Sequence, residues 1–386
     1  MIGALGISPK PPSRIQPERS CPGRRRAALP LRTIAAMLTA LPLVTGCGEP
    51  NANVPRRSIN LASDAYTVDQ IYRSMIGPKS TVSIAIEETE EPELLWITGY
   101  STSIVDAVSG EPRSAEFMCH NNLNLQDTFE HRRLFGREGV TLAGRLFTLS
   151  QGQMEVEFPQ GFGIPVLSTE RFRLETQVLN LNEQEEELQV RHETVLNYVR
   201  DRELDTPMKA LYQKGVQGLV LLKGKDGYFG VLNGSSEEHG EGCAIGMEAA
   251  NNRPVPDRFG RSFSAHWVVE PGREERRTLV TSMLDIMSDT TVHHIAVHLH
   301  PFAESLELLD LTAEQTVYKS NATNRVDGIG LEAVEYYSSV EGIELHADHQ
   351  YELVSTYNNT SGVEQDSMAV MFLYMLDDKF ENPLTN

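Results

Sequence analysis

Short segments rich in β-branched and aromatic residues recur from residue 81 to near the C-terminus, and turn residues separate them. Within residues 171–181, Phe172, Leu174 and Val178 alternate with polar and charged residues, so one face of an extended strand is apolar. Many short strands of this kind favour β-sandwiches or jelly rolls. We therefore predict an all-β protein, built as two consecutive jelly-roll β-sandwich domains after a cleaved signal peptide.

The predicted strands lie at residues 81–87, 94–105, 155–158, 171–181, 187–198, 218–222, 264–269, 277–288, 292–300, 305–310, 315–319, 351–357 and 367–375. A short helix is predicted at residues 64–75, with Asp64 or Thr67 as its N-cap.

The length of 386 residues is comfortable for two domains. We place the N-terminal jelly-roll domain at residues 63–205 and the C-terminal one at residues 206–380. A segment dense in Gly, Asn, Pro and Ser at residues 233–261 predicts a loop-rich excursion from the second domain.

The N-terminus has the features of an export signal. Arg24, Arg25 and Arg26 precede an apolar run that ends in Val-Thr-Gly directly before Cys47. This ending resembles a bacterial lipobox, in which Cys47 would be lipidated and become the mature N-terminus; an ordinary cleaved signal is the alternative. We predict a lipoprotein signal peptide at residues 1–46, a flexible tether at residues 47–62, and a location in the cell envelope, anchored by lipid and facing the periplasm or the outer surface.

Charge and cysteine content narrow the choice of partners. Removing residues 1–46, which hold seven basic residues and one acidic residue, changes the formal charge from −20 to −26. Nucleic acid is excluded as an expected partner, because phosphate binding needs a basic face. The mature chain keeps Cys119 and Cys243 besides Cys47, and in an oxidising compartment these two are a candidate disulfide, whose geometry the sequence leaves open.

Residues 291–302 contain four of the eleven histidines. In a strand, His298 and His300 point to the same side, roughly 6.6–6.8 Å apart along the chain, a spacing that suits two imidazoles on one metal ion. Structural roles are the alternative for each histidine. Met368 belongs to a second strand-forming segment, and two imidazoles with one thioether form a soft donor set suited to Cu(I).

These residues resemble the copper type II, ascorbate-dependent monooxygenases, which include peptidylglycine α-hydroxylating monooxygenase and dopamine β-monooxygenase. In that family two jelly-roll domains each carry one copper, and an H-x-H pair and a methionine hold the second. His298-Leu-His300 matches the pair, and Asp366-Ser-Met368 matches the methionine segment. His266, with the Trp-Val-Val-Glu-Pro-Gly that follows it, resembles the strand and turn that enter this region. The similarity spans residues 94–375.

The first copper site of the family is altered in this chain. The family uses an adjacent His-His pair and a later histidine, whereas this chain has His120 followed by Asn121, and Leu179 at the later position. Leucine binds no metal, so we expect a degenerate first site, in which His120 is vestigial or faces the substrate.

The resemblance implies an exported copper protein that hydroxylates a C–H bond of a small-molecule or peptide substrate with O₂, at one copper held by His298, His300 and Met368. Copper would cycle between Cu(I) and Cu(II), with ascorbate or another reductant as electron donor. The alternative is a non-catalytic envelope lipoprotein that binds or buffers copper, so the sequence leaves open whether the chain is an enzyme. It meets the membrane only through its lipid anchor.

Overall fold

The computed structural model describes residues 55–136, 144–182, 187–221 and 255–385. The predicted signal peptide and Cys47 lie outside these residues. Gly48–Asn386 form one compact unit. No helix among the described residues is long and apolar enough to cross a membrane.

The N-terminal half is a sandwich of two antiparallel sheets. One contains β1 (Arg57–Ala62), β10 (Leu188–Arg200), β4 (Leu94–Asp106) and β8 (Phe162–Leu167), and the other contains β3 (Lys79–Ile84), β9 (Phe172–Val178), β5 (Met118–Leu125) and β6 (Arg145–Leu149). Tyr100 and Leu196 of the first sheet pack with Leu123 and Phe172 of the second in one buried cluster. Alternation along each strand gives both sheets an apolar inner face.

The C-terminal half is also a sandwich. One sheet contains β11 (Lys209–Gln217), β24 (Ala369–Leu376), β17 (Thr290–Leu299) and β21 (Tyr337–Leu345); the other contains β16 (Gly272–Leu279), β22 (Tyr351–Asn359), β18 (Ala303–Asp310), β19 (Gln315–Asn324) and β20 (Leu331–Val334). Val297 and Met371 of the first sheet pack with Leu306 and Leu353 of the second.

Two small sheets also belong to this half. β15 (Trp267–Val269) pairs with β23 (Gln365–Ser367), and β14 (Ser262–Ser264) pairs with both β12 (Val220–Leu221) and β13 (Val255–Pro256).

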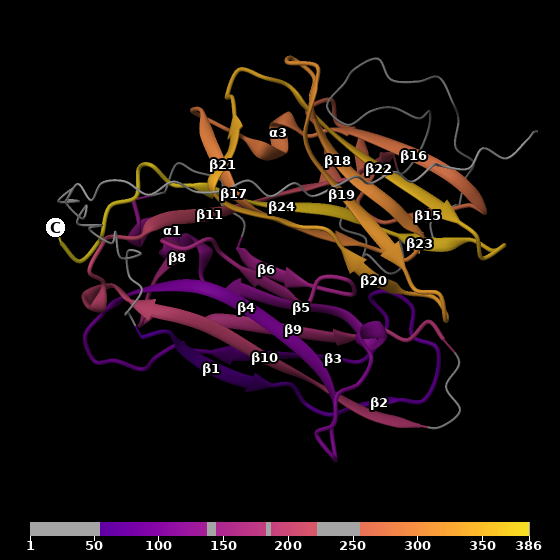
Figure 1. The fold of residues 1–386 in the computed structure, drawn as a ribbon, viewed down its shortest axis with the longest axis horizontal. Helices are drawn as coiled ribbons and strands as arrows, with labels where there is room; N and C mark the ends of the chain where they lie inside the picture. The colour runs from indigo at the N-terminus through magenta and orange to yellow at the C-terminus, as the bar shows by residue number, and fades with distance from the viewer. Residues whose placement is uncertain (1–54, 137–143, 183–186, 222–254, 386) are drawn as a thin grey trace, which may run out of the picture. The chain divides into compact units, whose positions relative to one another are not determined.

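Strand β11 joins the two halves, because it pairs in parallel with β8 and antiparallel with β24 (Figure 1). A continuous path of strands therefore runs β1-β10-β4-β8-β11-β24-β17-β21. In β24, Phe372 and Tyr374 pack into the core of the N-terminal half, whereas Met371 and Leu373 pack into the core of the C-terminal half. Burial on both faces explains why residues 369–376 are apolar almost without alternation.

The all-β prediction is confirmed, but three local predictions are wrong. Residues 57–62, predicted as part of the flexible tether, form β1 and pair antiparallel with β10. Residues 64–75 form no helix: they contain β2 (Tyr66–Val68), which pairs with β10 and buries Tyr66 and Val68. The predicted strand at residues 277–288 is also wrong. β16 ends at Leu279, and a short helix, α3 (Thr281–Leu284), follows and stops at Asp285, whose φ of 47° is left-handed.

A helix at α1 (Thr128–Leu134) was not predicted. The Asp127 side chain caps it by accepting a hydrogen bond from the Glu130 backbone N–H at 2.9 Å. Of the loop-rich excursion, residues 233–254 lie outside the described residues, and the part from residue 255 begins with β13. The division between residues 205 and 206 remains a prediction; it falls between β10 and β11.

His192 makes the N-terminal core sensitive to acid. Its ring is fully buried beside Tyr66, and both ring nitrogens lack a hydrogen-bond partner. Burial lowers the pKa of His192 from 6.5 to about 3, so the folded state keeps it neutral while the unfolded state protonates it below pH 6.5.

We expect His192 to contribute stability that is complete above pH 6.5 and lost progressively as the pH falls toward 3. Between pH 7 and pH 5 the loss is about 2 kcal/mol. Urea unfolding at the two pH values measures it, and His192→Leu, which never titrates, is expected to reduce the difference by that amount. An unchanged difference in His192→Leu would show that His192 is not the group responsible.

Candidate metal centre

Strand β17 brings His298 and His300 together. Val297 and Leu299 pack into the C-terminal core, so the histidines between and after them lie on the opposite face, toward the N-terminal half. The two ring centroids are 5.3 Å apart, with the ring planes nearly perpendicular. Both residues are 8% exposed, which places their imidazoles almost wholly out of solvent.

Met368 lies on the same face. The ladder between β17 and β24 pairs His298 with Val370 and ends with Leu299 opposite Ala369, so His300 and Met368 lie next to the last pair of the ladder. Met368 packs against the cluster that contains Ala296, Val370 and Phe372, the residues that face the N-terminal half. The sheet therefore presents two imidazoles and one thioether on one side.

Asp366 contacts the Nδ1 atom of His300. His300 Nδ1 is 3.2 Å from the Asp366 carbonyl oxygen and 3.5 Å from its carboxylate Oδ2. A contact of this kind fixes Nδ1 as the protonated nitrogen and leaves Nε2 as the nitrogen with a free lone pair. Burial raises the pKa of Asp366 to about 6, against the opposing effect of nearby His266.

Burial keeps the histidines of this region neutral. It lowers the pKa of His298 well below its usual range and that of His300 to about 4. Neutral imidazole is the form that binds metals, so both are in the binding form at neutral pH. The Nδ1 atom of His298 is buried without a hydrogen-bond partner.

His266 is a neighbour that sequence reasoning used only as part of a motif. Its ring centroid is 6.0 Å from that of His300, and its Nε2 is buried without a partner. Burial lowers its pKa to about 4. His266 lies directly before β15, and β15 pairs with the strand that carries Asp366, so His266 comes close to His300. No local spacing in the sequence indicates this long-range pairing.

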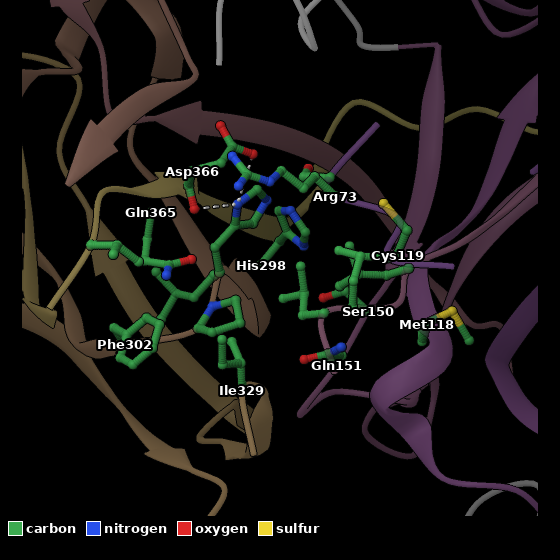
Figure 2. Close-up of a pocket in the computed structure, with 18 residues that line it drawn as sticks. Arg73, Met118, Cys119, Ser150, Gln151, His298, Phe302, Ile329, Gln365 and Asp366 are labelled. Atoms are coloured by element: carbon green, nitrogen blue, oxygen red, sulfur yellow. Dashed lines mark hydrogen bonds and ion pairs between the residues drawn. The ribbon is translucent and has the colours of Figure 1, made fainter. Parts of the chain in front are cut away.

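A cavity of about 220 Å³ adjoins the histidines, with walls from both halves of the chain. The N-terminal half contributes Met118 and Cys119, and the C-terminal half contributes His298, Phe302 and Asp366 (Figure 2). Most of the wall is apolar, and the Asp366 carboxylate oxygens are buried there without hydrogen-bond partners.

The positions of the family's first copper site have other roles here. Asn121 is fully buried inside the N-terminal sandwich, where it accepts a hydrogen bond from the Tyr100 hydroxyl and donates to Thr102 Oγ1 at 3.0 Å and Thr194 Oγ1 at 2.7 Å. Leu179 is buried and lines the cavity.

His120 lies near the histidines of the candidate centre, because positive charge on them, besides burial, lowers its pKa. Burial lowers its pKa to about 3, and Arg145, His192, His300 and His266 act in the same direction. It therefore lies within charge–charge range of His300 and His266, although no hydrogen bond links them.

His293, which also lies on β17, is engaged elsewhere. His293 contacts Thr291 Oγ1 at 2.8 Å and the Ser339 carbonyl oxygen at 3.0 Å, and its ring stacks on Phe162.

Cys119 is a buried free thiol, and burial raises its pKa to about 11. Cys243, its predicted disulfide partner, lies outside the described residues.

The donor set fits a soft metal ion. In the described ranges, no group of three or more His, Cys, Asp or Glu side chains is arranged to hold a metal; two imidazoles and a thioether are not such a group. His298 has an unpartnered Nδ1, and His300 has its Nε2 available because its Nδ1 contacts Asp366. A thioether ligand favours Cu(I) over hard cations.

No protein-family model matches the sequence, and no curated protein matches it. Solved structures give distant likenesses. PNGase F, a glycosylasparaginase from Flavobacterium meningosepticum, is 7% identical with a TM-score of 0.34, covering 83% of this chain and 96% of that chain. The STIV MCP is 9% identical with a TM-score of 0.28, covering 81% and 97%. PBCV-1 VP54, fitted into a reconstruction of the virophage Sputnik, is 7% identical with a TM-score of 0.32, covering 85% and 96%. Likenesses of this size support no inference about function.

Asn121 is expected to matter for stability and not for metal binding. Asn121→Ala removes the hydrogen bond of the buried Tyr100 hydroxyl and one hydrogen bond each of Thr102 and Thr194, which costs about 1–3 kcal/mol of unfolding free energy. Urea denaturation measures the cost, and a parallel copper titration should give the wild-type stoichiometry. Loss of copper without loss of stability would contradict this role.

Proposed function

We propose that this chain is an exported, lipid-anchored envelope protein that binds copper through His298, His300 and Met368. The observation that carries the proposal is the shared face: two buried, neutral imidazoles and a thioether project from one side of the β17–β24 ladder. The resemblance of His298-Leu-His300 and Asp366-Ser-Met368 to the copper type II monooxygenases supports the choice of metal.

The two histidines have different surroundings, which suggests a division of roles. His300 is oriented through its Nδ1 contact with Asp366, and its Nε2 would bind the metal. His298 has a buried Nδ1 without a partner, so a metal there would also remove the cost of an unsatisfied nitrogen. Copper bound at this set supplies one-electron redox chemistry and activation of dioxygen.

We expect purified protein to bind about one copper ion per chain, because the three proposed ligands form one donor set. Metal analysis after Cu(I) loading and gel filtration measures this. His298→Ala/His300→Ala should lose the ion. His346→Ala/His349→Ala removes the same number of imidazoles from a distant turn and should retain it. Metal-free wild-type protein after loading would refute the proposal.

Hydroxylation of a substrate C–H bond is a second candidate function, favoured by the cavity beside His298 and His300. In that reaction one oxygen atom of O₂ enters the C–H bond and the other leaves as water, with two electrons and two protons from ascorbate or another reductant. Copper storage is the non-catalytic alternative, favoured because Asn121 and Leu179 offer no first-site ligands.

Oxygen uptake separates these functions. If the chain is a hydroxylase, copper-loaded protein with ascorbate and a panel of small molecules and peptides should consume O₂ and yield hydroxylated product, and His298→Ala/His300→Ala should do neither. Product detection by mass spectrometry is essential, because free copper also oxidises ascorbate. Stoichiometric copper binding without product across the panel would leave copper storage as the function.

A further inference from the structure

The two ligand segments of the candidate centre meet where the sheet has ended. β17 ends at Leu299 and β24 begins at Ala369, so His300 and Met368 lie one step beyond the last ladder pair. No strand–strand pairing holds these two residues opposite each other, so other contacts set their separation.

The hydroxyl of Tyr357 makes one of these contacts, beside that of His300 Nδ1 with the Asp366 carbonyl oxygen. It accepts a hydrogen bond from the His300 backbone N–H at 3.3 Å and donates one to the Met368 carbonyl oxygen at 2.6 Å. One phenol oxygen thus replaces the missing ladder pair between the two segments. Donating to one segment while accepting from the other uses both hydrogen-bonding capacities of the hydroxyl.

Tyr357 is itself rigidly placed. It lies on β22, in the opposite sheet of the C-terminal sandwich, so its side chain reaches across the core to the metal-side sheet. The side chain is 1% exposed, and its ring meets the Trp267 ring edge to face at 5.9 Å. Its backbone pairs with Ala303, just after the turn that follows His300. Tyr357 of β22 therefore contacts both sides of the turn after His300, through its hydroxyl at His300 and through its backbone at Ala303.

We infer that Tyr357 is the positioning residue of the copper centre: its hydroxyl sets the spacing between the His300 imidazole and the Met368 thioether and thereby the preference for Cu(I). The inference rests on the proposed function, because it assigns a role toward the same metal. Tyr357 touches no metal in this account; it acts through the backbone of the two ligand residues.

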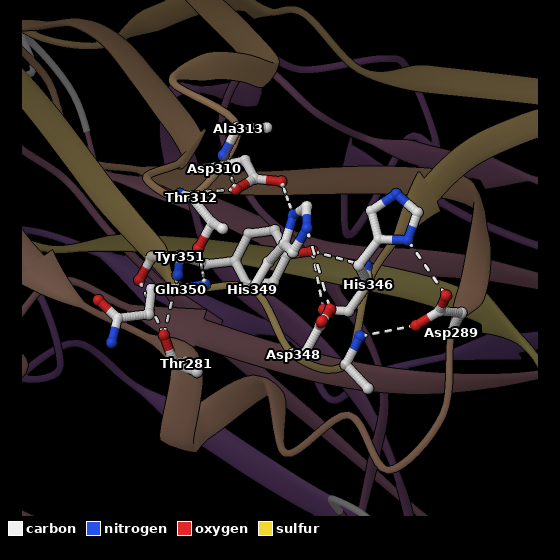
Figure 3. A network of polar contacts seen from close by, with 11 residues as sticks. Thr281, Asp289, Asp310, Thr312, Ala313, His346, Asp348, His349, Gln350 and Tyr351 are labelled. Atoms are coloured by element: carbon white, nitrogen blue, oxygen red, sulfur yellow. Dashed lines mark hydrogen bonds and ion pairs between the residues drawn. The ribbon is translucent and has the colours of Figure 1, made fainter.

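The chain offers a matched control on the same strand. Tyr351 is also 1% exposed, and its hydroxyl likewise accepts from a backbone N–H and donates to a carbonyl, both of His346, at 2.7 and 3.1 Å (Figure 3). Its contacts lie in the turn with His349 and Asp310, and none involves His300 or Met368. Removing either hydroxyl deletes one hydrogen bond from a backbone N–H and one to a backbone carbonyl, but only the Tyr357 hydroxyl joins the segments of His300 and Met368.

The test compares Tyr357→Phe, Tyr351→Phe and wild-type protein, each loaded with Cu(I). Competition against a chromophoric chelator gives the affinity, and X-ray absorption reports sulfur in the first shell of the metal. We expect Tyr357→Phe to weaken Cu(I) binding about tenfold, since two buried backbone groups lose their partner, and to reduce the sulfur signal while two nitrogens remain. Tyr351→Phe should match wild type in both readouts.

A double-mutant comparison sharpens the result. If the hydroxyl acts through the thioether, Met368→Leu alone and Met368→Leu with Tyr357→Phe should bind Cu(I) about equally. Copper binding with an unchanged sulfur signal in Tyr357→Phe would overturn the positioning role and leave the proposed function standing. Absence of copper from wild type would overturn both.

Should Tyr357→Phe not fold, 3-fluorotyrosine can replace Tyr357, because it retains the hydroxyl and makes it a stronger hydrogen-bond donor. We expect this replacement to change the Cu(I) affinity of the protein and the same replacement at Tyr351 to leave that affinity unchanged. Equal Cu(I) affinities in the wild type and both fluorotyrosine proteins would overturn the positioning role of Tyr357.

Discussion

The register between β17 and β24 is the constraint on which the rest of this structure depends. Because side chains alternate along a strand, that one register sends Val297 and Met371 into the C-terminal core and turns His298 and Val370 toward the N-terminal half. A slip of one residue would exchange the two sets. It would bury histidines among the aliphatic residues of the C-terminal core and remove His300 from the neighbourhood of Met368. Core packing and the candidate centre are therefore fixed by the same pairing.

The interior also contains several buried, neutral imidazoles. His192, His294 and His298 are buried with ring nitrogens that lack partners among the described residues. Each unsatisfied nitrogen costs free energy, and the rings of His192 and His294 pack against aromatic rings. His298 differs because a thioether and a second imidazole share its face. A metal bound to His298 would give its unsatisfied ring nitrogen a partner. For this reason a buried histidine supports a functional proposal at position 298 and a structural role at positions 192 and 294.

Sequence reasoning predicted the strands where alternation was strong, as at residues 171–181, and placed His298 and His300 on one face. It missed α1 although Asp127 and Glu130 have the spacing of a helix-capping pair, and it assigned a helix to residues 64–75, where pairing with β10 decides the conformation. It could not predict that His266 lies beside His300, or that Asn121 belongs to a buried network with Tyr100 and Thr194. Both depend on contacts between residues distant in sequence.

The central claim is that one metal ion occupies the face shared by His298, His300 and Met368. Crystals of Cu(I)-loaded protein, measured on both sides of the copper absorption edge, test it most directly. The account predicts a single strong anomalous peak at the end of β17, within bonding distance of both imidazoles and the Met368 sulfur. A peak at another group of residues, or none in protein that has been loaded with copper, would contradict it.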